Sequence, residues 1–274
     1  MFGALWNRLR EGKLLRRVTE AAAGRGAAWE GLEAARLLRT CGTARSVPAL
    51  CAALTQGPDA LRTECAAALA AMYTRHPDEQ VLRALNAAIA SERQPENVRV
   101  AAVEQLAGIV DARHARQFVE LLVKRNTPLV VCQAAFGALV RLGYPELLDR
   151  LVESYLFHSA SDGDPATRQW AVGELKALGD KQKLTKIHEI VHGRRRLDHY
   201  AVNADRGDLT RLILLMAQVE PQQSVRFLSQ MQDHSTRVIS SAAAAVLRKL
   251  RDARGDGTPS PPTHPASDDA AAQS

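Results

Sequence analysis

The chain has 274 residues, of which 46% are hydrophobic, so it can bury a large core, and its formal net charge is +6. No apolar run approaches the roughly 18 residues of a membrane span, and the N-terminus lacks the uninterrupted hydrophobic region of a secretory signal. Only 4% of the residues are aromatic, which leaves few rings for stacking on bases or sugars. We therefore expect a cytoplasmic protein that does not bind a small molecule.

The first 26 residues form a predicted amphipathic helix. Phe2, Leu5, Trp6 and Leu9 share one helical face, and residues 1–25 carry six Arg or Lys against two acids. We favour a helix that caps the open end of the repeat array that follows, because terminal repeats are atypical and need a soluble outer face. The alternative is an interfacial helix that lays Phe2, Leu5 and Trp6 into a membrane surface while the arginines meet anionic lipid.

A nine-residue pattern that ends in leucine recurs through residues 27–252. It reads LRTECAAAL at 61–69, VRVAAVEQL at 98–106, VCQAAFGAL at 131–139 and TRQWAVGEL at 167–175, with looser copies that end at Leu38 and Leu247. Successive copies are 31 to 37 residues apart, and a last gap of 72 residues leaves room for a degenerate copy near 205–219. Periods of this length indicate stacked helix pairs. We predict an all-α fold, an α-α superhelix or solenoid of about seven helix pairs.

The frame resembles the HEAT repeat, in the bacterial form that also occurs in bilin-lyase-like proteins. The segment EAARLLRTCGTARSVPAL at 33–50 carries the resemblance best, through its alanine pair, the glycine at the helix end and the Val-Pro that opens the next helix. The predicted organisation is a capping segment 1–26, a solenoid 27–252 and a tail 253–274, whose composition cannot build a core. A lyase-like accessory enzyme is one alternative that the resemblance implies.

Buried thiols and paired arginines are expected inside the array. The four cysteines show no CxxC pairing, and Cys41 and Cys65 fall on the buried frame of their helices, so we expect small core thiols. Arg62, Arg99 and Arg168 occupy one frame position. We expect these arginines to form a ladder of contacts with acids or carbonyls of neighbouring repeats.

The sequence HEIVH is the sharpest catalytic motif of the chain. His188 and His192 lie four residues apart on one helix face and could grip a zinc ion, with Glu189 as the general base. A catalytic zinc also needs a third protein ligand. In the extended motif HExxHxxGxxH a third histidine supplies it, but Gly193 and His199 do not have the spacing of that motif. We therefore favour two histidines at the solvent edge of a repeat helix, with no metal or cofactor. An HExxH hydrolase stays an alternative.

Two activities of HEAT-like proteins fit this chain poorly. The deoxyhypusine hydroxylases bind di-iron through His-Glu pairs, but the equivalent positions here are Arg62-Thr63, Arg99-Val100, Cys132-Gln133 and Arg168-Gln169. The alkylpurine DNA glycosylases cradle the duplex in a basic concave face, and phosphate contacts need a continuous run of Lys and Arg. Because the first four repeats are neutral overall, nucleic-acid binding is not the favoured function.

A basic segment is the best candidate for contact with a partner. Residues 181–211 carry eight Arg or Lys against four acids, and three consecutive arginines lie where the repeat frame lapses. The candidate partner-binding residues are Lys181, Lys183, Lys186, Arg194, Arg195 and Arg196. Because arginine favours carboxylate or phosphate, we expect an acidic protein surface as the partner. The favoured function is a non-enzymatic scaffold whose second helices line the concave face and bind another protein.

Overall fold

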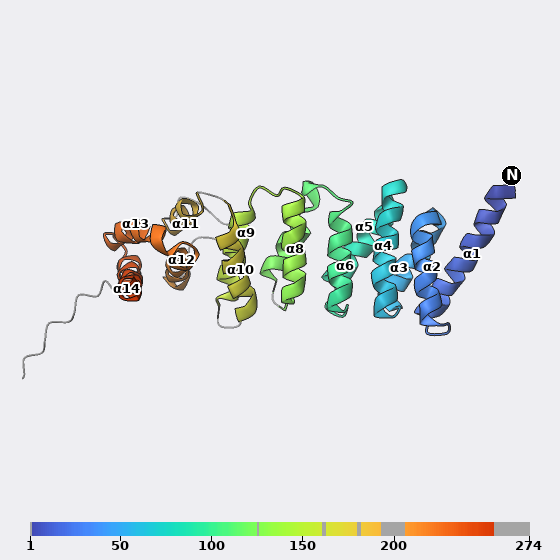
Figure 1. Ribbon diagram of the computed structural model, residues 1–274, viewed down its shortest axis with the longest axis horizontal. Helices are drawn as coiled ribbons and strands as arrows, with labels where there is room; N and C mark the ends of the chain where they lie inside the picture. The colour runs from blue at the N-terminus through green and yellow to red at the C-terminus, as the bar shows by residue number, and fades with distance from the viewer. Residues whose placement is uncertain (1, 125, 161–162, 180–181, 193–205, 255–274) are drawn as a thin grey trace, which may run out of the picture. The chain divides into compact units, whose positions relative to one another are not determined.

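The computed structural model describes residues 2–124, 126–160, 163–179, 182–192 and 206–254 (Figure 1). These residues contain fourteen α-helices, two short 3-10 helices and no strand, which confirms the all-α prediction. The chain divides into two compact units, residues 1–179 and residues 180–274. We call them unit 1 and unit 2 and describe each by itself.

Unit 1 contains five helix pairs. The first helices of the pairs are α1 (Phe2–Ala22), α3 (Val47–Gln56), α5 (Glu79–Ala90), α7 (Arg116–Val123) and α9 (Leu147–His158). The second helices are α2 (Ala28–Cys41), α4 (Asp59–Arg75), α6 (Glu96–Ala107), α8 (Leu129–Arg141) and α10 (Pro165–Ala177). The 3-10 helices η1 (Ala44–Ser46) and η2 (Ala112–His114) precede α3 and α7. Each first helix packs against its own second helix, and the second helices contact one another in chain order (Figure 1).

The leucine that ends the repeat frame is buried in every second helix of unit 1. Leu38, Leu69, Leu106, Leu139 and Leu175 are each 0% exposed. Full burial of one leucine side chain contributes about 1.5–3 kcal/mol, so these repeated anchors hold each pair to its neighbours. The prediction that the frame marks the core is confirmed at these positions.

The four cysteines are free thiols with different degrees of burial. Cys65 and Cys132 are buried and Cys51 is half-buried, but Cys41 is exposed. The prediction that Cys41 lies in the core is wrong, because α2 ends at this residue and the apolar stripe leaves the packed part of the helix there. Its thiol donates to the carbonyl oxygen of Leu37 instead, at 3.1 Å.

Helix α1 packs against α2 and α3, and a buried carboxylate fastens it to the turn before α3. Glu11 accepts hydrogen bonds from the backbone N–H of Thr43 at 2.9 Å, from the Thr43 hydroxyl at 2.8 Å and from the Ser46 hydroxyl at 2.6 Å. Burial raises the pKa of Glu11, but the hydrogen bonds from Ser46 and Thr43 outweigh this and hold the pKa below its usual value.

The membrane alternative for the N-terminal segment stays a prediction. Leu9 is exposed on α1, whereas the side chains of Phe2, Leu5 and Trp6 lie outside the residues whose side chains the structure describes. No helix in the described part of the chain is both long and apolar enough to cross a membrane.

Arginines join successive second helices of unit 1. Arg75, the last residue of α4, donates to the carbonyl oxygens of Arg39 at 2.8 Å and Gly42 at 3.3 Å, where α2 ends. Arg141, the last residue of α8, donates to the carbonyl oxygen of Glu104 in the last turn of α6 at 3.3 Å. The last four carbonyls of a helix have no partner within it, so each guanidinium satisfies groups that every repeat leaves open.

The expected arginine ladder between neighbouring repeats is present at one of its three positions. Arg62 donates to the side-chain oxygen of Gln94, in the following repeat, at 3.0 Å. Arg99 is buried, but it donates to the carbonyl oxygen of Ile89 in α5, the first helix of its own pair, at 3.0 Å. Arg168 is exposed and makes no such contact with the other described residues, so the ladder does not extend to α10.

The described residues of unit 2 form four helices. They are α11 (Lys183–Val191), α12 (Arg206–Val219), α13 (Pro221–Gln232) and α14 (Arg237–Arg254). Helix α11 packs against α12 and α13, and α14 packs against α12 and α13. The degenerate copy expected near 205–219 coincides with α12, and Leu247 of the last copy is buried in α14. Most of the expected tail 253–274 lies outside the described residues, and the predicted domain boundaries stay predictions.

Candidate functional site

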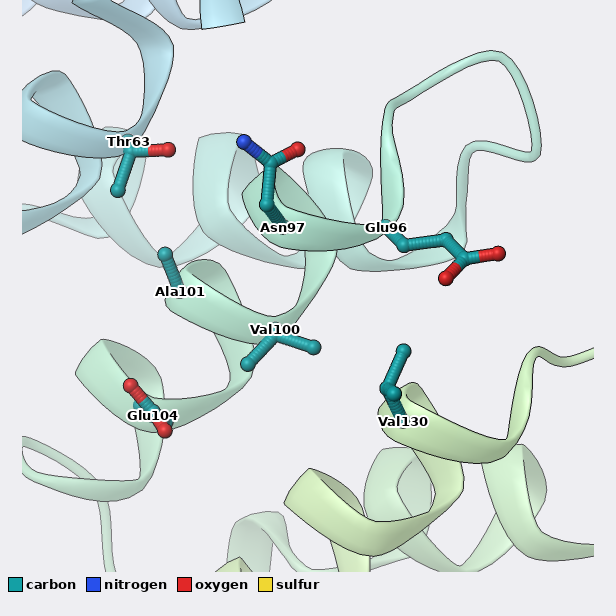
Figure 2. A pocket seen from close by; sticks show the side chains of 7 residues that line it. All are labelled: Thr63, Glu96, Asn97, Val100, Ala101, Glu104 and Val130. Carbon is teal, nitrogen blue, oxygen red and sulfur yellow. The ribbon is translucent and has the colours of Figure 1, made fainter. Parts of the chain in front are cut away.

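Three successive second helices of unit 1 form an open groove of about 620 Å³ (Figure 2). One lining residue comes from α4, one from α8 and the others from α6 between them. The groove is lined by Thr63, Glu96, Asn97, Val100, Ala101, Glu104 and Val130. We call this site the second-helix groove.

The repeat frame explains why α6 leaves this face open. Val98, Ala102 and Leu106 are spaced four residues apart and are fully buried, whereas Glu96, Val100 and Glu104 follow the same spacing two residues out of step. Two residues of an α-helix turn the chain by about 200°, so the second set lies on the opposite side from the core. The packing that buries the frame therefore leaves one face of the second helix available to a ligand.

The centre of the groove is apolar. Val100 on α6 and Val130 on α8 lie on opposite walls (Figure 2), and Val130 is 44% exposed. Ala101, with its short side chain, also lines the groove on α6. Single exposed valines are ordinary on a protein surface, but valines gathered in a concave site with a few polar groups are typical of a binding site.

Carboxylates flank the valines of the groove. Glu96 and Glu104 lie four residues before and after Val100, and both are exposed. No ion pair joins either carboxylate to another residue in the described ranges. The hydroxyl oxygen of Thr63 on the α4 wall is buried and has no hydrogen-bond partner among these residues. The groove thus offers apolar contact at its centre, negative charge on both sides and one unsatisfied hydroxyl group.

The buried cysteines offer no activated nucleophile. Burial, with a smaller contribution from the charge of Asp78, raises the pKa of Cys51 to about 11. Burial likewise raises the pKa of Cys132 to about 12 and also raises that of Cys65. A thiol must ionise before it can attack a carbonyl or bind a metal, so these three cysteines are neutral core residues at physiological pH.

The structure describes two of the six basic residues predicted to bind a partner. Lys183 begins α11, is only 7% exposed, and its Nζ lies 2.8 Å from the Oε1 of Glu220. Lys186 is half-exposed one turn later. The other four, Lys181, Arg194, Arg195 and Arg196, lie outside the described residues. Lys183 is engaged inside unit 2, and the prediction for the whole segment stays a prediction.

The HEIVH motif lies at the C-terminal end of α11. His188, Glu189 and His192 are all half-buried, and the Nε2 atoms of the two histidines are 3.0 Å apart. The ring of Phe227 lies 5.3 Å from that of His188, and the ring of His234 lies 4.9 Å from that of His192. Across the described ranges, no group of three or more His, Cys, Asp or Glu side chains could hold a metal ion.

Sequence reasoning named the second helices as the binding face but none of the residues of the groove. The sequence did contain a signal for the groove. Val100 is apolar, whereas the other copies have the polar residues Thr63, Gln133 and Gln169 at the same frame position. The sequence could not assign this valine to the surface, because a valine on a short helix is more often part of the core.

No protein-family model matches this chain, and no curated protein sequence matches it significantly. The function must therefore be argued from the residues and geometry of the chain itself.

Proposed function

We propose that this protein is a non-enzymatic HEAT-repeat scaffold, an α-solenoid of seven helix pairs that binds another protein along its second helices. The second-helix groove carries the proposal, because it combines valines on facing walls with two exposed carboxylates and an unsatisfied hydroxyl. A helix of a partner protein could lay an apolar face into such a groove.

The repeat architecture is supported by the order of packing and by the anchors. The described residues contain fourteen α-helices in succession, and the second helices of unit 1 contact one another in sequence. The recurring leucine is buried in each of them. Extended faces built from equivalent helices are how repeat arrays bind proteins.

The charges of the groove indicate the chemistry of the partner segment. Glu96 and Glu104 are separated by eight residues of one helix, which corresponds to about 12 Å. A partner segment that places one apolar side chain between Val100 and Val130, with a Lys or Arg on either side of it, would satisfy both carboxylates. Complementary charges fix the register of such a complex and speed its formation.

The basic segment is a second proposed contact, with an acidic surface of a partner. Replacing Arg194, Arg195 and Arg196 by glutamate is expected to weaken partner capture most clearly at low salt, where exposed charges are least screened. Equal capture by the triple variant and the wild type would leave recognition to the second-helix groove. No observation on the described residues favours a lyase-like enzyme, an HExxH hydrolase or a nucleic-acid binder over this scaffold.

Site-specific photo-crosslinking tests the groove directly. A photoreactive phenylalanine analogue replaces Val130 in the full chain, and Ala87, exposed on the first helix α5, provides the matched control position. We expect a protein crosslinked at position 130 and absent at position 87. Crosslinks of the same protein at both positions, or at position 87 alone, would contradict binding in the groove.

A charge substitution then measures the contribution of the groove with the purified partner. In Val100→Lys the new ammonium group lies four residues from both Glu96 and Glu104, so it fills the apolar centre and neutralises the flanking charges. We expect calorimetry to show at least about tenfold weaker binding, equivalent to about 1.4 kcal/mol. Ala87→Lys adds the same charge to the opposite helix of this pair and should bind as the wild type does. Equal affinities for the two variants would exclude the groove.

A further inference from the structure

A buried histidine lies at the junction of α9 and α10 in unit 1, apart from the second-helix groove. His158 is the last residue of α9 and is only 3% exposed. Its Nδ1 accepts a hydrogen bond from the backbone N–H of Asp164, the residue before α10, at 3.3 Å. A Cβ at Gly163 would lie 2.5 Å from the backbone of His158. The chain that enters α10 therefore packs directly on this histidine.

The residue that contacts His158 is also the N-cap of α10. The Asp164 carboxylate accepts hydrogen bonds from the backbone N–H of Ala166 at 3.2 Å and of Thr167 at 2.8 Å, and from the Thr167 hydroxyl. The first N–H groups of a helix have no partner within it, so these bonds satisfy the start of α10. Asp164 thus offers its main chain to His158 and its side chain to the helix.

The contact with the main chain of Asp164 requires a neutral ring. An imidazole nitrogen that accepts a hydrogen bond carries no proton, so the neutral ring of His158 is protonated at Nε2. When Nδ1 gains a proton it becomes a donor, and it can no longer accept from the Asp164 N–H. The carboxylate of the same residue, whose charge acts on His158, is an acceptor that binds a charged donor more strongly than a neutral one.

We propose that His158 is an acid-operated switch at the start of α10. The neutral ring holds the main chain of Asp164, and the protonated ring takes its carboxylate instead and releases the N-cap. The backbone N–H groups of Ala166 and Thr167 then lose their acceptor, and the first turn of α10 loosens. No group outside the junction is needed, because one residue supplies both the donor and the acceptor.

The surroundings of His158 keep the ring neutral in the folded state. Helices α7 and α10 pack against α9. Burial lowers the pKa of His158, against smaller opposite effects of the Leu122 carbonyl oxygen on α7 and of the Asp164 charge on the α10 side. The contribution of the neutral ring to stability is therefore complete above the unfolded pKa of histidine, about 6.5. It declines as the pH falls from there to the folded pKa.

The carboxylate that the switch needs stays ionised over this range. The hydrogen bond from the Thr167 hydroxyl, with those from the backbone N–H groups of Thr167 and Ala166, lowers the pKa of Asp164 despite its partial burial. Asp164 is thus still negatively charged when the ring of His158 takes up its proton, and it can accept from that ring.

Nuclear magnetic resonance of the full chain with isotope-labelled histidine tests the neutral state. We expect the neutral ring of His158 to be protonated at Nε2 and to titrate below the ordinary histidine pKa of about 6.5. The signal is assigned by its absence from His158→Asn. A neutral ring protonated at Nδ1, or a pKa at or above the ordinary value, would overturn the proposal.

Amide hydrogen exchange then follows the N-cap in the wild type. At about one pH unit below the measured ring pKa, the protection factors of Ala166 and Thr167 should be at least about tenfold smaller than at about one unit above it. Gln80 is the internal control, because the Asp78 cap of α5 accepts from its backbone N–H at 2.8 Å, and its protection should not change. Unchanged protection at Ala166 and Thr167, or an equal loss at Gln80, would contradict the switch.

The variant His158→Asn separates the proton from the contact. The side-chain oxygen of asparagine accepts from the Asp164 N–H as Nδ1 does, but it takes up no proton in this range. We expect the protection of Ala166 and Thr167 in this variant to stay within about threefold between the two pH values. The same loss as in the wild type would show that another group releases the cap. If His158→Asn does not fold, the comparison with Gln80 in the wild type decides.

Discussion

Both compact units contain side-chain ion pairs, but the described residues of unit 1 also show a contact that recurs from repeat to repeat. In unit 1 an arginine at the end of one second helix donates to main-chain carbonyls of the preceding one, as Arg75 does at the end of α2. In unit 2 Lys183 pairs with Glu220, and Arg211 pairs with Asp208 at 2.6 Å. Every helix end has open carbonyls whatever its sequence, so the first kind of contact can recur from repeat to repeat. The second kind needs two particular side chains, and it occurs in both units, as in the buried pair of Arg150 and Glu153 at 2.7 Å on α9 of unit 1.

The largest expected effect is the loss of unit 1 on replacing a frame leucine. Leu106→Asp puts a carboxylate at a fully buried position of α6, where an unpaired charge is strongly unfavourable. We expect more than about 4 kcal/mol of destabilisation, seen by circular dichroism as lost helix. Val100→Asp, on the open face of the same helix, is the matched control and should fold normally. A cooperative, stable Leu106→Asp protein would show that the frame does not mark the core.

A pair of methionine substitutions tests the difference between these two kinds of contact. Lys183→Met preserves the bulk of a buried side chain but leaves Glu220 without this partner, and we expect a loss of about 1–3 kcal/mol in urea unfolding. In Arg75→Met the carbonyl oxygens of Arg39 and Gly42 lose this donor. Because the side chain of Arg75 is exposed, water can solvate these carbonyls, and the loss of stability should be below about 1 kcal/mol. The reverse order of the two losses would contradict the comparison.

The buried carboxylate of unit 1 should give a pH-dependent contribution to stability. The pKa of Glu11 is lowered in the folded state, so its contribution is complete above the unfolded pKa, about 4.3, and is lost as the pH falls through the folded pKa. Glu11→Gln should cost about 1–2 kcal/mol at pH 7, because its hydrogen bonds lose their charge. The difference from the wild type should shrink at about pH 3.

Urea unfolding at both pH values measures this, with Glu20→Gln on the same helix as the control. Glu20 pairs with Arg16 at 3.7 Å on the exposed side of α1, where an ion pair contributes little. The difference in the free energy of unfolding between Glu11→Gln and the wild type should change with pH. If it does not, the stabilising effect of these hydrogen bonds does not depend on the charge of Glu11.

The smallest expected effect is a gain in stability at the exposed glycine of α8. A Cβ at Gly137 would meet no atom within 4 Å, and glycine inside a helix costs about 0.5–1 kcal/mol relative to alanine. Gly137→Ala should therefore stabilise unit 1 by about that amount in urea unfolding. Gly31→Ala in α2 is the opposite case, since its Cβ would lie 2.3 Å from the Cβ of Ala21, and it should destabilise the same unit. A loss of stability in Gly137→Ala would show that another part of the protein covers this surface of α8.

The sequence predicted the parts of the fold that recur. Four aligned copies of the frame and two looser ones identified Leu106 and its equivalents as buried, because the same helical face had to be apolar in every copy. Single residues were less predictable. Cys41 followed the same spacing but fell at the end of its helix. Lys183 was predicted to contact a partner but pairs with Glu220, which lies between α12 and α13. Contacts of that kind depend on where a distant helix packs, and neither propensity nor periodicity encodes it.

The candidate sites were predictable to a similar degree. The four-residue spacing of His188 and His192 placed both rings on one helix face, as observed. Their 3.0 Å separation and the packing of Phe227 and His234 around them depend on side-chain rotamers and on α13. For the second-helix groove the sequence indicated the binding face, but the facing valines lie on two different helices and meet only in the folded unit.

The division into two units has a spectroscopic consequence. All three tryptophans, Trp6, Trp29 and Trp170, belong to residues 1–179. Trp29 is 69% exposed, whereas the indole of Trp170 packs edge-on against Phe136 and donates to Glu174 at 3.0 Å. Tryptophan emission therefore reports on unit 1 alone, while peptide absorption in the far ultraviolet sums both units. Coincident midpoints from the two signals would indicate one cooperative block, and separate midpoints would show that each unit unfolds by itself.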